Sequence, residues 1–173
     1  MEAEELVVLI NEKDEVQGLM NKLEAHENGL LHRAFSVFLF NKKGEMLLQK
    51  RASSKYHSPN QWTNAVCSHP RDEESYKNAA LRRLNEELGI TTDITEKFHF
   101  IYKADVGGNL WEHELDHVFI GTFDDEPKLN PDEVMAYRWV ELDDLKKDME
   151  KNPQNYTAWF KIIFEHYVSY IEE

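Results

Sequence analysis

The 173-residue sequence is poor in cysteine and in basic side chains, and both shortages limit what it can do. Its one cysteine, Cys67, excludes a disulfide within the chain, so this thiol is either buried filler or a reactive or metal-binding group. Twenty Lys and Arg stand against 33 Asp and Glu, which gives a formal net charge of -13. A surface this acidic repels nucleic acid and anionic membranes, so we expect neither as a partner.

Long apolar runs are also absent, and none approaches the roughly 20 residues that a helix needs to cross a bilayer. The start, Met1 to Glu5, is acidic where a secretory signal would be basic. These absences predict a soluble protein of the cytoplasm. Since 41% of the 173 residues are hydrophobic, the chain can fill one core, and we predict a single domain over residues 1–173. The sequence itself does not determine the oligomeric state, for which a monomer is our expectation.

Several motifs that would bind phosphate or supply a nucleophile are missing. The sequence has no Gly-rich phosphate loop, no serine in a nucleophile elbow and no dinucleotide-binding fingerprint. A small phosphorylated ligand would therefore need bound cations or a local basic pocket.

Hydrophobic periodicity and turn residues divide the chain into strands followed by helices. An opening hairpin comes first, then a short helix between Asn21 and Gly29 and a second hairpin. A helix near the middle and two at the end complete the pattern, which predicts an α+β fold with a mixed β-sheet sandwiched between helices. The expected strands are 6–10, 16–20, 30–40, 46–51, 62–68, 98–104, 110–123 and 135–140, and the expected helices are 22–26, 74–88, 143–151 and 156–171.

Acidic residues recur on one side of the strand 110–123. Alternation places Glu112, Glu114 and Asp116 on the same face. Glu112 and Glu114, about 7 Å apart at Cα, repel each other unless a cation or solvent screens them. The pair therefore indicates either a metal site or a solvated sheet face.

Three histidines, His26, His32 and His69, could add imidazole ligands to these acids. Imidazole and carboxylate together suit Zn, Mn or Fe, and several strands would have to converge to supply them. No zinc-finger spacing links the three, so the alternative for each is a surface or structural histidine.

Charged residues on the helix 74–88 allow two interpretations. Glu74, Glu86 and Glu87 either pair with Arg82 and Arg83 or hold Mg²⁺, which prefers one or two carboxylates together with phosphate oxygens. The pairs run Arg before Glu, the less favourable order on a helix, which favours the site.

The basic and aromatic residues elsewhere in the chain also allow two interpretations. Tyr102 and Trp159 suit a core as well as a catalytic site. Four basic residues, separated in sequence, form either a phosphate pocket or ordinary surface charge: Lys22, Arg51, Lys55 and Arg83.

The stretch 61–89 resembles a Nudix box with two substitutions. Ser68 stands where the Nudix pattern has Gly, and Arg83 stands where it has Glu. A strand that ends in Cys-Ser-His-Pro before such an altered box resembles the metal-dependent (type 1) isopentenyl-diphosphate isomerases. The resemblance continues from the first strand to the last helix, through the 22–26 segment, His32 before Ala-Phe-Ser, Arg51-Ala-Ser-Ser-Lys55, Trp-Thr-Asn before Cys67, His69-Pro70, Glu87, Tyr102, Glu112-His-Glu114 and Trp159.

That resemblance implies a Nudix-like fold and two kinds of metal site. One divalent ion, Mn, Zn or Mg, would be bound by three histidines and two glutamates. A second ion, Mg²⁺, would arrive with the diphosphate of the substrate, and the four basic residues would grip that diphosphate. The implied ligands are His26, His32, His69, Glu112 and Glu114 for the first ion, and Glu87 with the Cys67 backbone carbonyl for the second.

The implied reaction interconverts isopentenyl diphosphate and dimethylallyl diphosphate, the precursors of isoprenoid biosynthesis. An unactivated alkene is a very poor base, so a strong acid on one face and a base on the other are needed, shielded from water. The resemblance assigns Glu114 with Tyr102 to protonation and Cys67 to removal of the C2 proton. Trp159 would offer its ring face to the carbocation.

Two other functions remain alternatives. A Nudix hydrolase of a nucleoside-diphosphate derivative would use the same helix, but Arg83 removes one carboxylate that hydrolases use for their metals and adds a phosphate ligand. A diphosphate-binding module without turnover is the third possibility, and it leaves the occupied catalytic positions without a purpose.

Overall fold

The computed structural model describes the backbone of residues 5–55 and 57–172 and, except at 167–170 and 172, their side chains. Most of the acidic start, residues 1–4, lies outside this part. In chain order the elements are β1 (Leu6–Ile10), β2 (Val16–Asn21), α1 (Lys22–Asn28), β3 (His32–Phe40), β4 (Met46–Arg51), β5 (Trp62–Thr63), β6 (Val66–Ser68), α2 (Tyr76–Leu88), β7 (Ile94–Gly107), β8 (Leu110–Thr122), β9 (Val134–Val140), α3 (Leu142–Lys151), the 3₁₀ turn η2 (Pro153–Asn155) and α4 (Ala158–Glu172).

Strand β3 lies at the centre of a mixed sheet that joins all nine strands of the described residues. It runs parallel to β8 from His32, opposite Glu114, to Phe40, opposite Thr122. On its other edge it pairs antiparallel with β6 and meets β4 only where Phe40 faces Met46. Most β3 side chains are buried, as expected for a strand covered on both faces.

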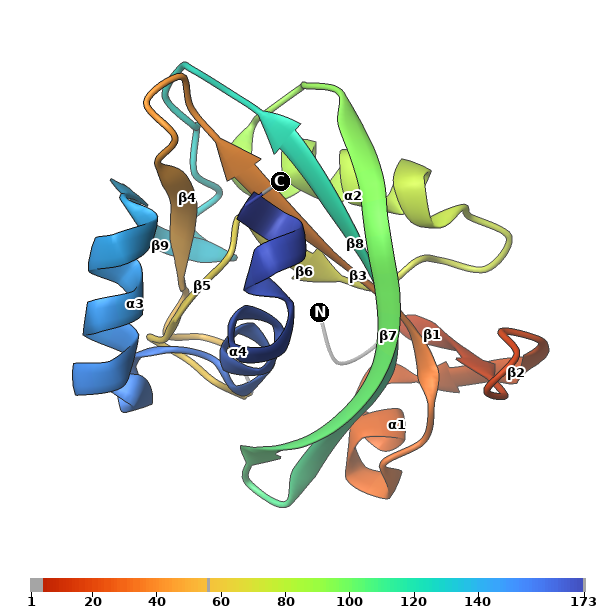
Figure 1. Cartoon of the computed structure of the whole chain (residues 1–173). Coiled ribbons are helices and arrows are strands. Elements are labelled where there is room, and N and C mark those ends of the chain that lie inside the picture. The colour runs from red at the N-terminus through yellow and green to blue at the C-terminus, as the bar shows by residue number, and fades with distance from the viewer. Residues whose placement is uncertain (1–4, 56, 173) are drawn as a thin grey trace.

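Helices cover the two faces of this sheet (Figure 1), and each contributes to its own core. Alternate β3 residues point to opposite faces, so Val37 packs with Leu84 of α2, whereas Phe38 packs with Phe160 of α4. Three residues that recur at helical spacing on α2, Ala80, Leu84 and Leu88, are fully buried. The predicted α+β sandwich is therefore correct.

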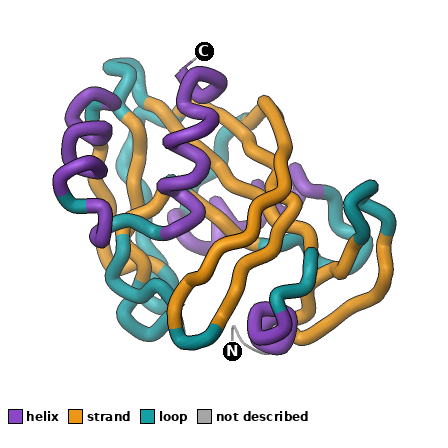
Figure 2. Tube along the Cα trace, turned by 60° about the horizontal axis from the view of Figure 1, so that its bottom comes forward, coloured by secondary structure: helices purple, strands orange, loops and turns teal. Residues whose placement is uncertain are grey.

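Strands β7 and β8 form a long hairpin that reaches past the rest of the sheet, with α1 packed beside β8 (Figure 2). Its two-residue turn, Gly108 and Asn109, has positive φ values of 63° and 62°, the conformation that a tight hairpin turn requires. The hairpin is longer than predicted at both ends of β7. It carries Glu112 and Glu114 next to α1.

Two predicted elements differ from the structure. The strands 30–40 and 46–51 do not form a paired hairpin beyond one residue pair, because β3 takes β8 and β6 as partners. The predicted strand 62–68 is split at Asn64, whose side-chain amide donates to the carbonyls of Val37 and Val66.

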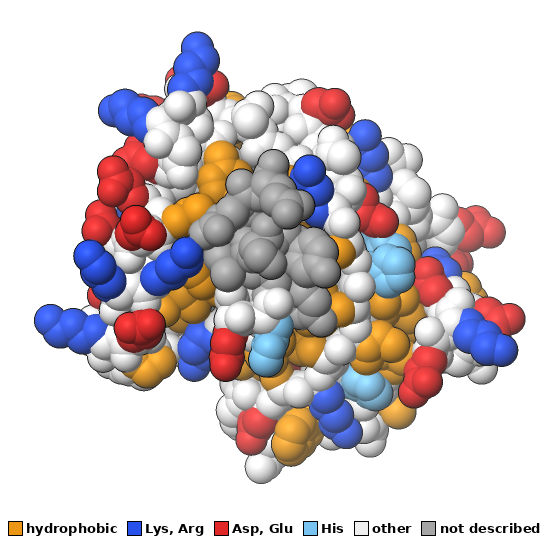
Figure 3. Space-filling model, viewed as in Figure 1, with side chains coloured by type: hydrophobic (Ala, Val, Ile, Leu, Met, Phe, Trp, Pro, Cys, Tyr) orange, Lys and Arg blue, Asp and Glu red, His pale blue; other side chains and the backbone are white. Residues whose placement is uncertain are grey.

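Charged side chains of both signs lie around the edge of the face shown in Figure 3, and hydrophobic side chains lie nearer its middle. None of the helices in the described part of the chain has the length and apolarity needed to cross a membrane. That residues 1–173 form a single domain stays a prediction.

Candidate active site and metal centre

Helix α1 is a seven-residue helix that places His26 inside the protein. The Asn21 side chain caps its start by accepting from the backbone N–H groups of Leu23 and Glu24. Gly29, at φ 62°, ends it in the left-handed conformation that favours glycine. His26 is fully buried, with Nε2 3.9 Å from Oε2 of Glu114.

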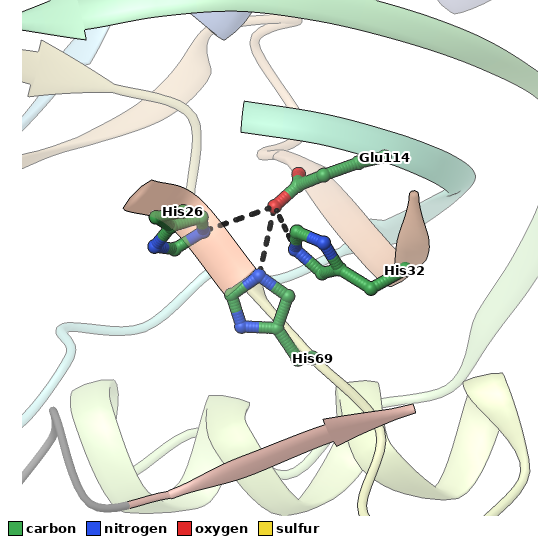
Figure 4. A group of neighbouring side chains, drawn as sticks. All are labelled: His26, His32, His69 and Glu114. Carbon is green, nitrogen blue, oxygen red and sulfur yellow. Dashed lines mark hydrogen bonds and ion pairs between the residues drawn. The ribbon is translucent and has the colours of Figure 1, made fainter. Parts of the chain in front are cut away.

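His32 and His69 reach the same carboxylate from different strands. His32 is the first residue of β3 and lies opposite Glu114 in the parallel register, with Nε2 3.0 Å from Glu114 Oε2. His69 follows β6, and its Nε2 lies 2.8 Å from that oxygen. Figure 4 shows all three imidazoles turned toward the carboxylate of Glu114. The four ligand atoms lie within 4.8 Å of one another.

The protonation states of His26, His69 and Glu114 are those that binding of a divalent metal ion requires. Burial opposes charge on Glu114, yet its interactions with His69, His26 and His32 hold its pKa well below the usual range. Burial lowers the pKa of His69 to about 3 and also lowers that of His26, so both imidazoles are neutral at pH 7. Neutral imidazoles around a carboxylate are the form in which these side chains bind a divalent metal.

The hydrogen bonds of His32 provide a second test of whether these residues can hold a metal ion. Its Nδ1 lies 2.8 Å from the carbonyl oxygen of Leu30, so the ring proton belongs there, and Nε2 then faces an oxygen of Glu114. Such a contact needs a proton or a cation between the two atoms. Metal-binding histidines commonly hold their second nitrogen in this way.

Glu112 lies near this group without joining it. The structure places it in an overlapping group with His26 and His57, so the five-ligand set implied by the resemblance is brought together only in part. Burial, together with the negative charge of Glu114, raises the pKa of Glu112 well above its usual value. A solvated sheet face is excluded, since Glu112 and Glu114 are only 5% and 4% exposed.

The hydroxyl of Tyr102 connects the two glutamates. It lies 2.6 Å from Oε1 of Glu114 and 3.0 Å from Oε1 of Glu112. Burial and the two carboxylates raise the Tyr102 pKa, so the phenol keeps its proton. One hydroxyl proton serves one oxygen at a time. Protonated Glu112 can donate to the Tyr102 oxygen while Tyr102 donates to Glu114.

Cys67 is partly exposed and free, and polar groups surround its sulfur. The thiol donates to Oδ1 of Asn64 at 2.9 Å, and the indole N–H of Trp159 donates to Sγ at 3.0 Å. The Ser36 hydroxyl lies 3.5 Å from Sγ and donates to Asp116 at 2.8 Å. Burial and the charge of Asp116 raise the Cys67 pKa, so this group is a thiol at neutral pH. These contacts are unlike those of buried filler.

The four basic residues are buried, with exposed fractions between 4% and 9%, so they are not ordinary surface charges. A buried cation needs an anionic partner. Lys55 and Arg83 both contact Glu133, and Arg83 also pairs with Glu87 at 3.0 Å. Lys22 Nζ lies 4.0 Å from Glu5, and it lines the central cavity together with Arg51.

The acids of α2 divide into two kinds. Glu74 forms a bidentate pair with Arg82, which also contacts Glu86, so the ordinary ion-pair interpretation is confirmed for these residues. Glu87 is different, because it is 4% exposed and accepts from Gln49 at 3.0 Å as well as from Arg83.

Cys67, Tyr102, Glu114 and Trp159 line one narrow cavity of about 20 Å³, which has room for about one water molecule. The predicted acid and base therefore face a common space. Trp159 is 2% exposed, and the Arg51 guanidinium lies 5.1 Å from its ring centroid.

Sequence reasoning missed several residues around this cavity. Asp116 was placed on the correct strand face but given no role. His57 and Glu133 carried no signal of their own, and Ser36 entered only as part of the Ala-Phe-Ser run of the resemblance. The alternation of acids along β8 could have found Asp116.

Sequence comparison shows which known proteins this chain resembles. The NUDIX domain model matches residues 30–160. Isopentenyl-diphosphate Delta-isomerase 2 of Photorhabdus laumondii is 49% identical over 160 residues, which cover 92% of this chain and 90% of that protein. Isopentenyl-diphosphate Delta-isomerase 1 of Aromatoleum aromaticum is 44% identical over 170 residues, with 98% and 96% of the two chains covered.

Solved structures show the same fold at lower identity. A protein from Deinococcus radiodurans superposes with a TM-score of 0.77 at 20% identity, over 94% of this chain and 99% of that one. A MutT protein from Methanosarcina mazei gives a TM-score of 0.66 at 22% identity, over 83% and 96% of the two chains. From the matching domain model and these relatives, the chain belongs to the Nudix family and, within it, to the isopentenyl-diphosphate Delta-isomerases.

Proposed function

We propose that this protein interconverts isopentenyl diphosphate and dimethylallyl diphosphate. It adds a proton to the terminal methylene carbon of the alkene and removes another proton from C2. The observation that carries the proposal is the shared cavity, into which both Cys67 and the Tyr102–Glu114 pair open. Together they supply proton-transfer groups of two different kinds to one bound alkene.

Tyr102 and Glu114 protonate the terminal methylene of the alkene. The Tyr102 hydroxyl donates to Glu114 and also lies 3.0 Å from Glu112, so it connects the Glu114 carboxylate with the substrate side of the site. Protonation consumes the double bond and leaves a tertiary carbocation at C3. The aromatic ring of Trp159 stabilises that cation by roughly 0.5–2 kcal/mol.

In its thiolate form, Cys67 takes the proton from C2, and the C–H electron pair becomes the new double bond. Because its pKa is raised, the sulfur holds this proton firmly once it is bound. The same raised pKa makes the thiolate costly to form, and the Trp159 N–H donor lowers that cost. In the reverse direction the two groups exchange roles, as a reversible isomerisation requires.

The diphosphate is held by Lys22, Arg51, Lys55 and Arg83, whose burial excludes competing water. His26, His32, His69, Glu112 and Glu114 would hold a divalent ion, Mn, Zn or Mg, which would supply positive charge beside the reacting carboxylate. Glu87 and the Cys67 carbonyl would hold Mg²⁺ that enters with the substrate. We expect the enzyme to work as a cytoplasmic monomer without nucleic-acid or membrane partners.

The test is incubation of the purified, metal-loaded protein with isopentenyl diphosphate and Mg²⁺, followed by separation of the two isomers. We expect dimethylallyl diphosphate, and its loss in the Cys67→Ala variant. No product in either direction would overturn the proposal. Release of phosphate or nucleotide from nucleoside-diphosphate derivatives would instead identify a hydrolase, which the Arg83–Glu87–Glu133 contacts disfavour.

A further inference from the structure

A fourth histidine, the buried His57, lies beside the metal centre and has no role in the assignments above. It is 6% exposed, and its Nε2 lies 3.5 Å from Oε2 of Glu112. His26 Nε2 lies 4.0 Å from the same oxygen, and its ring centroid is 5.4 Å from that of His57. The ligand atoms of these three residues lie within 4.8 Å of one another.

These separations suit ligands of one ion. In octahedral coordination, atoms that each bind an ion at about 2.1 Å are about 3.0 Å apart when adjacent and about 4.2 Å apart when opposite. The distances of 3.5 Å and 4.0 Å to Glu112 fall between the two limits. His26 belongs to this group and also to the group formed with His32, His69 and Glu114.

The orientation of His57 repeats that of His32. In His32, Nδ1 contacts a backbone carbonyl while Nε2 faces Glu114. In His57, Nδ1 contacts the Ser58 hydroxyl at 3.2 Å while Nε2 faces Glu112. Such a second contact is how proteins orient a metal-binding imidazole. Ser58 has a positive φ of 51°, a strained conformation for a non-glycine residue that is common at binding sites.

We propose that His57 is a further ligand of the divalent ion of the His/Glu centre, bound through Nε2 beside His26 and Glu112. The inference rests on the metal centre of the proposed function and adds a fourth imidazole to it. With His57, six protein side chains would be available to hold the ion. The ion would supply positive charge beside the two glutamates and fix their positions.

His57 would also connect the ion to the substrate-binding residues. Its backbone carbonyl accepts a hydrogen bond from Arg51 at 3.2 Å, and its ring meets the edge of Trp159 with centroids 5.8 Å apart. Binding of His57 to the ion would therefore also hold Arg51 and Trp159, which line the cavity, in position.

The experiment counts imidazole nitrogens on the ion in Mn²⁺-loaded protein, without substrate, by pulsed EPR. We expect four coupled nitrogens in the natural protein and three in His57→Ala and His57→Gln. The exposed residue His166 provides the control variant His166→Ala, which should keep four. Competition with a chelator should show at least a tenfold weaker Mn²⁺ affinity in the His57 variants.

Three nitrogens in the natural protein, or an unchanged count in the His57 variants, would overturn the inference. The count in the natural protein decides the matter even if both variants fail to fold. Failure of the proposed function is distinguishable, because a protein that binds Mn²⁺ through four imidazoles yet forms no dimethylallyl diphosphate loses only the proposed reaction.

Discussion

The indole nitrogen of Trp159 donates a hydrogen bond of 3.0 Å to the sulfur of Cys67, and thereby ties α4 to the end of β6. The two residues are 92 positions apart in sequence. A donor aimed at the sulfur stabilises thiolate more than thiol. Trp159 thus has two parts in the site, a ring face for a cation and an N–H for the base.

Trp159→Phe separates these parts, since it keeps an aromatic ring and removes the N–H donor. One hydrogen bond is worth about 0.5–1.5 kcal/mol, so we expect turnover to fall by about 2–10-fold. Trp139→Phe, in the other core cluster, is the control and should leave turnover unchanged. An unaffected rate in Trp159→Phe would show that the hydrogen bond does not assist the base.

The raised pKa of Cys67 predicts slow alkylation at neutral pH. Only thiolate reacts, and below the thiol pKa its fraction rises tenfold for each pH unit. The rate with iodoacetamide should therefore still be climbing at pH 9, where an ordinary thiol of pKa about 8.5 has begun to level off. A plateau near pH 8.5 would contradict this prediction.

Tyr102→Phe removes the hydroxyl between Glu112 and Glu114 and keeps the ring in its core. We expect kcat to fall by about 10²–10⁴-fold, the usual contribution of a positioned proton donor, with a small change in KM. Tyr137→Phe, packed against the opposite core, serves as the control. A loss below fivefold would assign protonation to another group.

Metal affinity should rise with pH because of Glu112. Burial and the neighbouring Glu114 raise its pKa, so the group is protonated in the metal-free protein and must lose a proton when it binds an ion. Below that pKa the affinity should increase about tenfold per pH unit, with one proton released per ion. Calorimetry in buffers of different ionisation enthalpy measures the release, and Glu112→Gln should abolish it.

Arg83→Gln tests the residue that distinguishes this helix from the Nudix pattern. Its guanidinium neutralises Glu87 and Glu133, and the proposed role adds the diphosphate. A hydrogen bond to a charged group is worth about 1.5–3 kcal/mol, so kcat/KM should fall about 10–150-fold, mainly through KM. Arg82→Gln, on the same helix, should change kcat/KM little.

Local sequence patterns predicted most of the elements, because caps and turns depend on neighbouring residues. Asn21 and Gly29 correctly marked the ends of α1, and the spacing of Leu84 and Leu88 correctly marked the buried side of α2. The pairing of β3 with β8 could not be predicted, since His32 and Glu114 are 82 positions apart and parallel pairing leaves no local trace.

The candidate site was predicted through family resemblance more than through chemistry. Composition and spacing left Glu112 and Glu114 with a choice between a metal site and a solvated face, and only the burial of both removed the second option. His57 escaped notice because a histidine among Ser, Pro and Asn looks like part of a surface loop. Its burial follows from long-range packing against Glu112 and Trp159.

Residues before 30, which lie outside the matched Nudix domain, hold His26, whereas His32, His69 and Glu114 lie inside it. Strand β1 pairs with β3 where Leu9 lies opposite His32. An ion bound to His26 and Glu114 would therefore link the N-terminal segment, which consists of the first hairpin and α1, to the matched Nudix domain. Removing the metal would loosen the N-terminal segment first. Occupancy of the metal site would then control whether Lys22 of α1 lines the cavity.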